Sequence, residues 1–196
     1  MLVLQYEIIS WDEAYNMCYY LFEKLINANE FPDIIVGIAR GGWIPARLLS
    51  DFYGNKFTAN IKIEFYRDTS QVRENPIITQ ELTAEVKSKK ILIVDDVADS
   101  GKSLQAAMEH IKTKGPKSIK TATLHYKKHS VVVPDFYINL TDKWIVYPWE
   151  YGEFIAFQYK ELRKKHTVLE IKKQLKDIGI PPHLVESYFE KVLTNN

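Results

Sequence analysis

The sequence has 196 residues, of which 46% are hydrophobic and 13% aromatic, and this composition excludes a disordered chain. Lys and Arg number 26 against 25 Asp and Glu, so a net charge of +1 argues against a protein built mainly to coat nucleic acid or an acidic membrane. A single cysteine, Cys18, excludes an internal disulfide and a zinc site made of cysteines. The start lacks a signal-peptide pattern and no apolar run reaches about 18–20 residues, so we expect a cytoplasmic protein without a membrane segment.

The first part of the chain predicts strands and helices in alternation. A short strand precedes Ser10-Trp11-Asp12-Glu13, a capping box that opens an amphipathic helix over residues 11–28. The wholly apolar run 34–38 predicts a strand covered on both faces, and residues 43–53 predict a second helix. A strand over about residues 57–66 then leads into residues 67–80, which are polar and lack a period. We interpret 67–80 as a long loop, and loops of this length in compact domains are typically functional or disordered.

The second part continues the alternation and then changes character. The apolar run 91–94 predicts a third buried strand, followed by a helix from Lys102 to Lys114 and a strand over about residues 119–126. Residues 135–159 predict short aromatic strands, and residues from Lys160 onward predict charged helices separated by Pro181-Pro182. The alternation predicts an α/β fold with a parallel sheet, in which ligands bind at the carboxyl ends of the strands.

The segment after the third strand carries the most specific chemistry. Asp95 and Asp96 end the strand, and Ser-Gly-Lys-Ser opens the next helix, where unpaired backbone N–H groups and the helix dipole suit a phosphate. The two carboxylates can hold a diol or a hydrated magnesium ion, so the segment is typical of a site for ribose 5-phosphate. Asp99 follows as a third carboxylate, and a plain helix N-cap explains one Asp but not three. A P-loop is excluded because its first glycine would fall at Asp96.

The segment VDDVADSGKS resembles the phosphoribosyl-pyrophosphate (PRPP) signature of type I phosphoribosyltransferases. The resemblance implies the type I phosphoribosyltransferase fold, a central mainly parallel sheet flanked by helices with a small hood region, over residues 1–158. Residues 159–196 would form a helical C-terminal extension. Asp95 and Asp96 would bind the ribose hydroxyls, and residues 98–103 would wrap the 5-phosphate. The PRPP-binding residues implied are Asp95, Asp96, Val97, Ala98, Asp99, Ser100, Gly101, Lys102 and Ser103.

Two further implications concern pyrophosphate and proton transfer. IARGGWIPARLL is similar to the pyrophosphate loop of 6-oxopurine phosphoribosyltransferases, which implies that Ala39, Arg40 and Gly41 bind pyrophosphate and that the Ala39-Arg40 peptide is cis. On its own residues, the loop fits a helix-opening turn with a surface arginine equally well. By the same resemblance, Asp99 would be the catalytic residue, facing N7 of the purine and accepting its proton or stabilising the transition state. The alternative is that Asp99 only orders its loop.

The resemblance also implies a purine pocket. Lys127 would donate to the oxygen at purine C6 and disfavour the amino group of adenine, with Lys128 as the alternative in register and a solvated strand end as the plain reading. DKWIVYPWE looks like the purine-stacking region of bacterial xanthine-guanine phosphoribosyltransferases. Trp144 would stack on the base, and the backbone near Ile145 would read the C2 edge. An aromatic core cluster is the competing interpretation.

Magnesium is the implied cofactor, held by Asp95, Asp96 and Glu150 directly or through water, although Glu150 could serve the purine instead. Residues 67–80 fit a mobile flap that closes over PRPP, with Tyr66, Arg67 and Arg73 as candidate contacts. The five histidines show no metal-ligand spacing, so we expect each of them to be structural or exposed.

The implied function is purine salvage by a magnesium-dependent transferase that joins a 6-oxopurine to PRPP, giving a nucleoside monophosphate and pyrophosphate. The alternatives are a phosphoribosyltransferase for adenine or a pyrimidine, and a non-catalytic PRPP-binding regulator. We expect no nucleic-acid or membrane partner, and a homodimer or homotetramer. The sequence does not rank xanthine, guanine and hypoxanthine.

Overall fold

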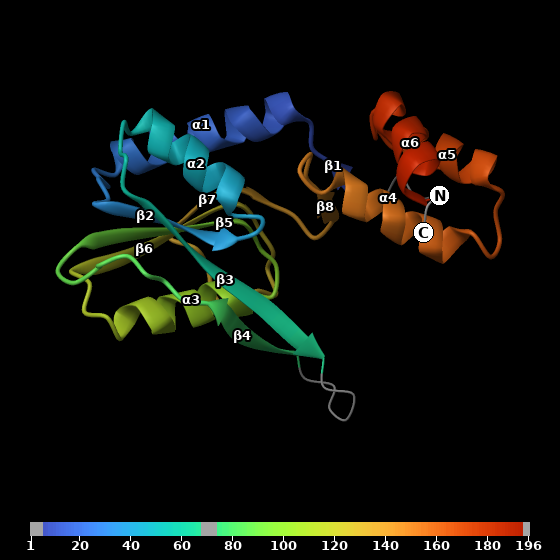
Figure 1. Cartoon of the computed structure of the whole chain (residues 1–196). Coiled ribbons are helices and arrows are strands. Elements are labelled where there is room, and N and C mark those ends of the chain that lie inside the picture. Colours follow the sequence, from blue (N-terminus) through green and yellow to red (C-terminus); the bar gives the residue numbers. More distant parts are fainter. Residues whose placement is uncertain (1–5, 68–73, 194–196) are drawn as a thin grey trace. The chain divides into compact units, whose positions relative to one another are not determined.

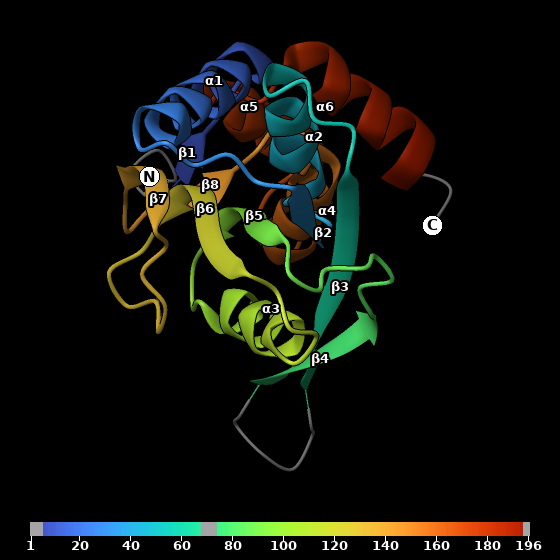
Figure 2. The ribbon, with the colours of Figure 1, turned by 90° about the vertical axis from the view of Figure 1, so that its left-hand side faces the viewer.

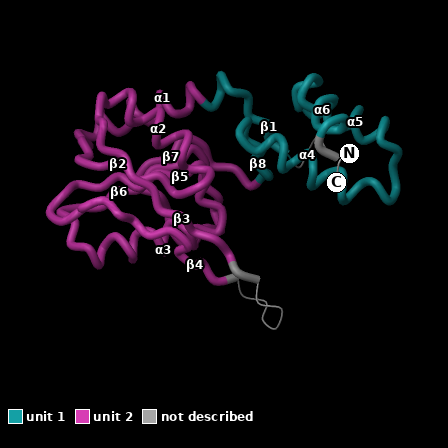
Figure 3. Tube along the Cα trace, viewed as in Figure 1, with its two compact units in different colours: residues 1–14, 143–196 teal, residues 15–142 magenta. Residues whose placement is uncertain are grey.

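The structure, a computed structural model, describes residues 6–67 and 74–193 (Figure 1). The chain forms two compact units, which are described separately: unit 1 comprises residues 1–14 and 143–196, and unit 2 comprises residues 15–142 (Figure 3). The expected boundary after residue 158, between a family domain and a helical C-terminal extension, stays a prediction.

Unit 2 is built around a six-stranded sheet with the strand order β4-β3-β2-β5-β6-β7. The strands pair in parallel except for β4, which pairs antiparallel with β3. Their bounds are β2 (Ile34–Ala39), β3 (Thr58–Arg67), β4 (Glu74–Gln80), β5 (Lys90–Ala98), β6 (Ser118–Tyr126) and β7 (Phe136–Leu140). The expected α/β fold with a mainly parallel sheet is confirmed.

Helices cover both faces of this sheet. α1 (Trp11–Asn27) and α2 (Trp43–Phe52) lie on one face, and α3 (Lys102–Lys112) lies on the other (Figure 2). All six residues of β2 are buried, as its apolar sequence predicts for a central strand covered on both sides. The core beneath α3 contains Val36, Ile93 and Ile111, each fully or almost fully buried.

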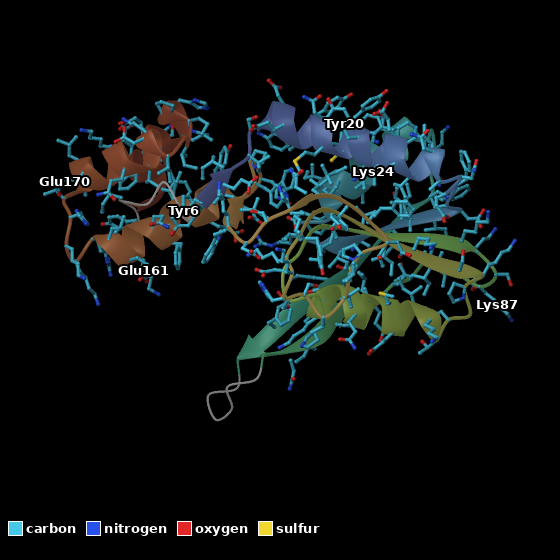
Figure 4. The ribbon with its side chains drawn as sticks, turned by 180° about the vertical axis from the view of Figure 1, so that it is seen from behind. Tyr6, Tyr20, Lys24, Lys87, Glu161 and Glu170 are labelled. Carbon is cyan, nitrogen blue, oxygen red and sulfur yellow. The ribbon has the colours of Figure 1, made fainter. Side chains whose placement is uncertain are left out.

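α1 begins and ends with specific contacts. The predicted capping box is confirmed, because the Ser10 amide donates to Glu13 Oε2 at 2.8 Å and the Glu13 amide donates to Ser10 Oγ at 3.2 Å. Further along, Lys24 Nζ donates to the Tyr137 carbonyl of edge strand β7 at 2.8 Å. Tyr20 and Lys24 are both labelled on α1 in Figure 4.

Two segments differ from the sequence-based expectation. Residues 74–80, predicted as loop, form β4, in which half-buried Pro76 and Ile78 alternate with exposed Asn75, Ile77 and Thr79. Residues 151–159, predicted within a region of aromatic strands, belong to a helix, α4 (Tyr151–Leu162). Its buried residues Tyr151, Phe154, Ile155 and Gln158 follow helical spacing and point to one core.

Unit 1 combines a small parallel strand pair with helices. β1 (Tyr6–Ile8) pairs with β8 (Trp144–Val146), and the helices are α4, α5 (Val168–Asp177), α6 (Pro182–Tyr188) and a π-helical turn, η1 (Phe189–Leu193). Pro181-Pro182 separates α5 from α6, as predicted. Glu170, labelled in Figure 4, completes a capping box with Thr167 at the start of α5. Among residues 6–67 and 74–193, no helix is long and apolar enough to cross a bilayer.

Candidate active site

The two adjacent carboxylates lie at the end of β5. This strand was predicted over residues 91–94 but extends from Lys90 to Ala98, because β6 continues to pair with it after its pairing with β2 has ended at Val94. The Asp96 amide donates to Asp95 Oδ1 at 3.0 Å, and the Val97 amide donates to Asp96 Oδ1 at 2.8 Å. Asp96 is only 5% exposed. These hydrogen bonds hold both carboxylates at the carboxyl edge of the sheet.

A tight turn joins β5 to α3. Gly101 is the N-cap of α3 and has φ +75°, a left-handed conformation that glycine adopts without steric cost. A Cβ built on Gly101 would lie 2.2 Å from Ser130 Oγ and 2.8 Å from the Val132 amide nitrogen. Lys102 and Ser103 form the first turn of α3, so the predicted phosphate loop ends at a helix N-terminus.

The turn after β2 packs against the end of β5. Ala39 is the last residue of β2, and its peptide bond to Arg40 is cis, which confirms the expectation from the resemblance. A Cβ built on Gly41 would lie 2.1 Å from Asp96 Oδ2, and one on Gly42 would lie 2.4 Å from the Val94 carbonyl oxygen. The structure therefore brings the proposed pyrophosphate loop and the proposed ribose-binding carboxylates into direct contact.

Asp99 and Lys127 form an ion pair across the ends of neighbouring strands. Lys127 follows β6, and its Nζ lies 3.1 Å from Asp99 Oδ2. The Lys127 side chain is 12% exposed, against 55% for Asp99, whereas Lys128 is exposed. The geometry thus favours Lys127 over its neighbour as the residue that faces the predicted base.

His129 also contacts Asp99, which the sequence interpretation missed. Its Nε2 lies 2.9 Å from Asp99 Oδ1. The available signal was position: His129 stands two residues after Lys127, in the loop that follows a strand next to β5. We predicted that each histidine would be structural or exposed, and His129 is exposed but makes this specific contact.

The remaining predicted base-binding residues belong to unit 1. Trp144 is 53% exposed, and its ring centroid lies 5.5 Å from that of Phe157. Ile145 is buried, and its backbone is paired in register with Glu7 of β1. Glu150, the N-cap of α4, lines a cavity of about 270 Å³ together with Trp144 and Glu153. An exposed indole beside carboxylates suits a flat ligand with hydrogen-bond donors.

Magnesium fits the donor atoms at the β5 end. Within the described part of the chain, no three His, Cys, Asp or Glu side chains gather as a ready metal site. Mg²⁺ commonly binds one or two carboxylates and takes its other ligands from water and substrate phosphates, so the pair Asp95 and Asp96 suffices chemically.

Of the predicted flap contacts, Arg73 lies outside the described residues, and so do the side chains of Tyr66 and Arg67.

Comparisons with known proteins agree with this geometry. A sequence model of the family described as "Phosphoribosyl transferase domain" matches residues 7–153. A xanthine-guanine phosphoribosyltransferase of Cereibacter sphaeroides is 32% identical over 162 residues, covering 78% of this chain and 89% of the relative. One of Idiomarina loihiensis is 28% identical over 144 residues, covering 72% and 85%. The crystal structure of a purine phosphoribosyltransferase from Pyrococcus horikoshii matches with a TM-score of 0.68 and 40% identity, covering 74% of this chain and 93% of that one.

Proposed function

Because the chain belongs to the phosphoribosyl transferase domain family, we propose that it is a purine phosphoribosyltransferase acting in purine salvage. It transfers the 5-phosphoribosyl group of PRPP to a 6-oxopurine, which is xanthine, guanine or hypoxanthine, and releases the nucleoside monophosphate and pyrophosphate. Relatives named xanthine-guanine phosphoribosyltransferase support this substrate class.

The single observation that carries the choice of base is the Lys127–Asp99 pair. A 6-oxopurine carries O6, an acceptor, next to N7 on one edge, and the free base can hold a proton on N7. The ammonium of Lys127 is a donor and the carboxylate of Asp99 is an acceptor, and they lie 3.1 Å apart. The pair therefore complements that edge. Adenine has an amino donor at C6, which would face the Lys127 ammonium unfavourably.

The proposed reaction is a displacement at C1′ of the ribose. N9 of the base forms a bond to C1′ of the ribose while the bond from C1′ to the pyrophosphate oxygen breaks, and its electron pair leaves with pyrophosphate. The proton on N7 passes to Asp99 Oδ2, and Lys127 holds O6. Arg40, exposed after β2, binds the departing pyrophosphate with its guanidinium, and the amides of residues 98–103 hold the 5-phosphate.

Magnesium would be held by Asp95 and Asp96, with Glu150 as a further candidate ligand. When bound, Mg²⁺ supplies positive charge that neutralises the leaving pyrophosphate. Since Glu150 lines the same cavity as Trp144, we favour contact between Glu150 and the purine. Turnover should vanish with EDTA and return with added Mg²⁺, and activity that persists in EDTA would contradict the requirement.

We also propose that the chain forms a homodimer or homotetramer and acts in the cytoplasm. Aromatic side chains of α1 support an interface, because Tyr15, Tyr19 and Tyr20 are 50%, 42% and 54% exposed. Sedimentation equilibrium tests the oligomer, and a Tyr19→Asp variant should shift the chain toward monomer.

The deciding experiment offers six bases separately to the purified chain with PRPP and Mg²⁺: hypoxanthine, guanine, xanthine, adenine, uracil and orotate. We expect chromatography to show nucleotide formation from the 6-oxopurines only. Turnover of adenine or a pyrimidine instead would assign the chain to another base. No turnover of any base, with tight PRPP binding by calorimetry, would identify a regulator.

A further inference from the structure

Backbone hydrogen bonds join the loop after β6 to the proposed phosphate loop, residues 98–103, on both sides of Asp99. The Lys127 amide donates to the Ala98 carbonyl at 3.0 Å, and the Val131 amide donates to the Ser100 carbonyl at 2.9 Å. The Ser130 amide donates to the Lys127 carbonyl at 3.0 Å and closes the turn between these two points. Residues 127–131 therefore form a short bridge, with its backbone fixed at both ends.

His129 stands within this bridge and contacts the side chain of Asp99. Nε2 of His129 lies 2.9 Å from Asp99 Oδ1, while Lys127 Nζ lies 3.1 Å from Asp99 Oδ2. A carboxylate only accepts hydrogen bonds, so Nε2 of His129 carries the proton in this contact. Each oxygen of Asp99 thus has its own nitrogen donor, and the two donors come from the same bridge.

The demands on these two donors differ during the proposed reaction. Lys127 has to turn its ammonium toward O6 of the purine, which weakens its hold on Asp99. Asp99 is 55% exposed, so without a second contact its carboxylate would rotate into solvent and lose its aim at N7. A donor that stays on Oδ1 leaves Oδ2 directed at the base.

We infer that His129 is a positioning residue for proton transfer, which holds Asp99 through Oδ1 so that Oδ2 accepts the proton from N7 of a 6-oxopurine. This inference rests on the proposed function. In this role His129 acts through Asp99, so its removal should affect the chemical step and leave PRPP binding unchanged.

The test compares His129→Phe with His129→Gln. Phe retains a planar ring without a donor, whereas Gln retains an N–H donor without an imidazole. Because the contact is partly exposed, His129→Phe should lower kcat by about 3- to 10-fold at unchanged KM for PRPP. His129→Gln should recover most of that loss. The matched control is His183→Phe on α6, at an exposed position, which should behave as wild type.

A double-mutant cycle with Asp99→Asn tests whether the loss of kcat in His129→Phe depends on the Asp99 carboxylate. If His129 acts through Asp99, adding His129→Phe to Asp99→Asn should give no further loss. An unchanged kcat in His129→Phe, no recovery with Gln, a rise in KM for PRPP, or a full additional loss in the Asn background would each overturn the inference. Wild-type turnover of 6-oxopurines is measured first, so failure of the proposed function is seen separately from failure of this inference.

Discussion

The carboxylate of Asp96 packs directly on the α-carbon of Gly41. A Cβ at position 41 would lie 2.1 Å from Asp96 Oδ2 and 2.5 Å from Asp96 Cγ. Atoms in real proteins do not approach this closely, so any side chain at residue 41 must displace a buried carboxylate. The contact joins the turn that we propose to bind pyrophosphate to the carboxylates that we propose to bind the ribose hydroxyls.

We therefore expect Gly41→Ala to damage the PRPP site. Overpacking costs about 1–3 kcal/mol, which corresponds to a loss of about 5- to 150-fold in kcat/KM for PRPP. Steady-state kinetics with varied PRPP measures the loss. Gly54→Asn is the control, since the space around Gly54 is open and Asn tolerates its φ of +61°. Wild-type kinetics in Gly41→Ala would show that Asp96 can move without harm.

Gly101→Ala should disturb both halves of the site. The residue has φ +75°, and its Cβ would lie 2.8 Å from the Val132 amide nitrogen, a backbone atom that cannot rotate away. The left-handed conformation alone costs an alanine about 1–2 kcal/mol. Because the clash pushes the proposed phosphate loop away from the segment that follows Lys127, we expect KM to rise for both PRPP and the base. A rise in only one of the two constants would contradict the coupling.

The sequence predicted the sheet and the carboxyl-edge loops well because these depend on local patterns. Continuous apolar runs identified the central strands, and the acidic pair at residues 95–96 lies near the carboxyl end of β5, where we propose that ribose binds. The cis peptide at Ala39-Arg40 was found where the family resemblance placed it. A strand that is covered on both faces is apolar along its whole length, and such a short continuous run predicts the strand directly.

The features that were missed depend on partners distant in the sequence. β4 exists because its residues pair with β3, and a seven-residue stretch with four polar residues and Pro76 gives only a weak strand signal. Aromatic and apolar residues at positions 151, 155, 157 and 159 also suit a period of 2, so the sequence predicts strand where the structure has the start of α4. The contact of His129 with Asp99 needs the ends of β5 and β6 to be adjacent, which no spacing along the chain encodes.

Lys127→Gln should weaken selection for 6-oxopurines. Gln removes the charge next to Asp99 and offers both an acceptor and a donor to the base. Loss of a hydrogen bond from a charged group predicts a fall of about 10- to 100-fold in kcat/KM for the preferred 6-oxopurine, and a narrower ratio to adenine. Competition assays with paired bases measure that ratio. Lys128→Gln, at the exposed neighbouring position, should retain wild-type selectivity.

Cys18 provides a test of core integrity and its dependence on pH. Burial raises the pKa of the Cys18 thiol to about 12, against about 8.5 for a free cysteine. Since the raised pKa belongs to the folded state, the contribution of the protonated thiol to stability is complete below about pH 8.5 and is lost as the pH rises toward 12.

Only the thiolate reacts with iodoacetamide, so at pH 9 the native chain should resist alkylation and the urea-unfolded chain should react rapidly. As Cys18 is the single cysteine, mass spectrometry reads the result directly, and rapid labelling of the native chain would contradict the buried position.

The C-terminal helices should be integral to the stability of unit 1. Ile171 of α5 is 0% exposed and shares a core with Val146 of β8 and Phe154 of α4, whereas Leu169 on the same helix is 78% exposed. Ile171→Ala should lower the free energy of unfolding by about 2–4 kcal/mol because it leaves a cavity, and Leu169→Ala should change it by less than about 0.5 kcal/mol. Urea denaturation of the two variants measures both values. Since the same core holds the strand that carries Trp144, Ile171→Ala should also raise KM for the base at temperatures where unit 1 begins to open. Equal stability of the two variants would instead describe a C-terminal segment that is attached to the rest of unit 1 only loosely.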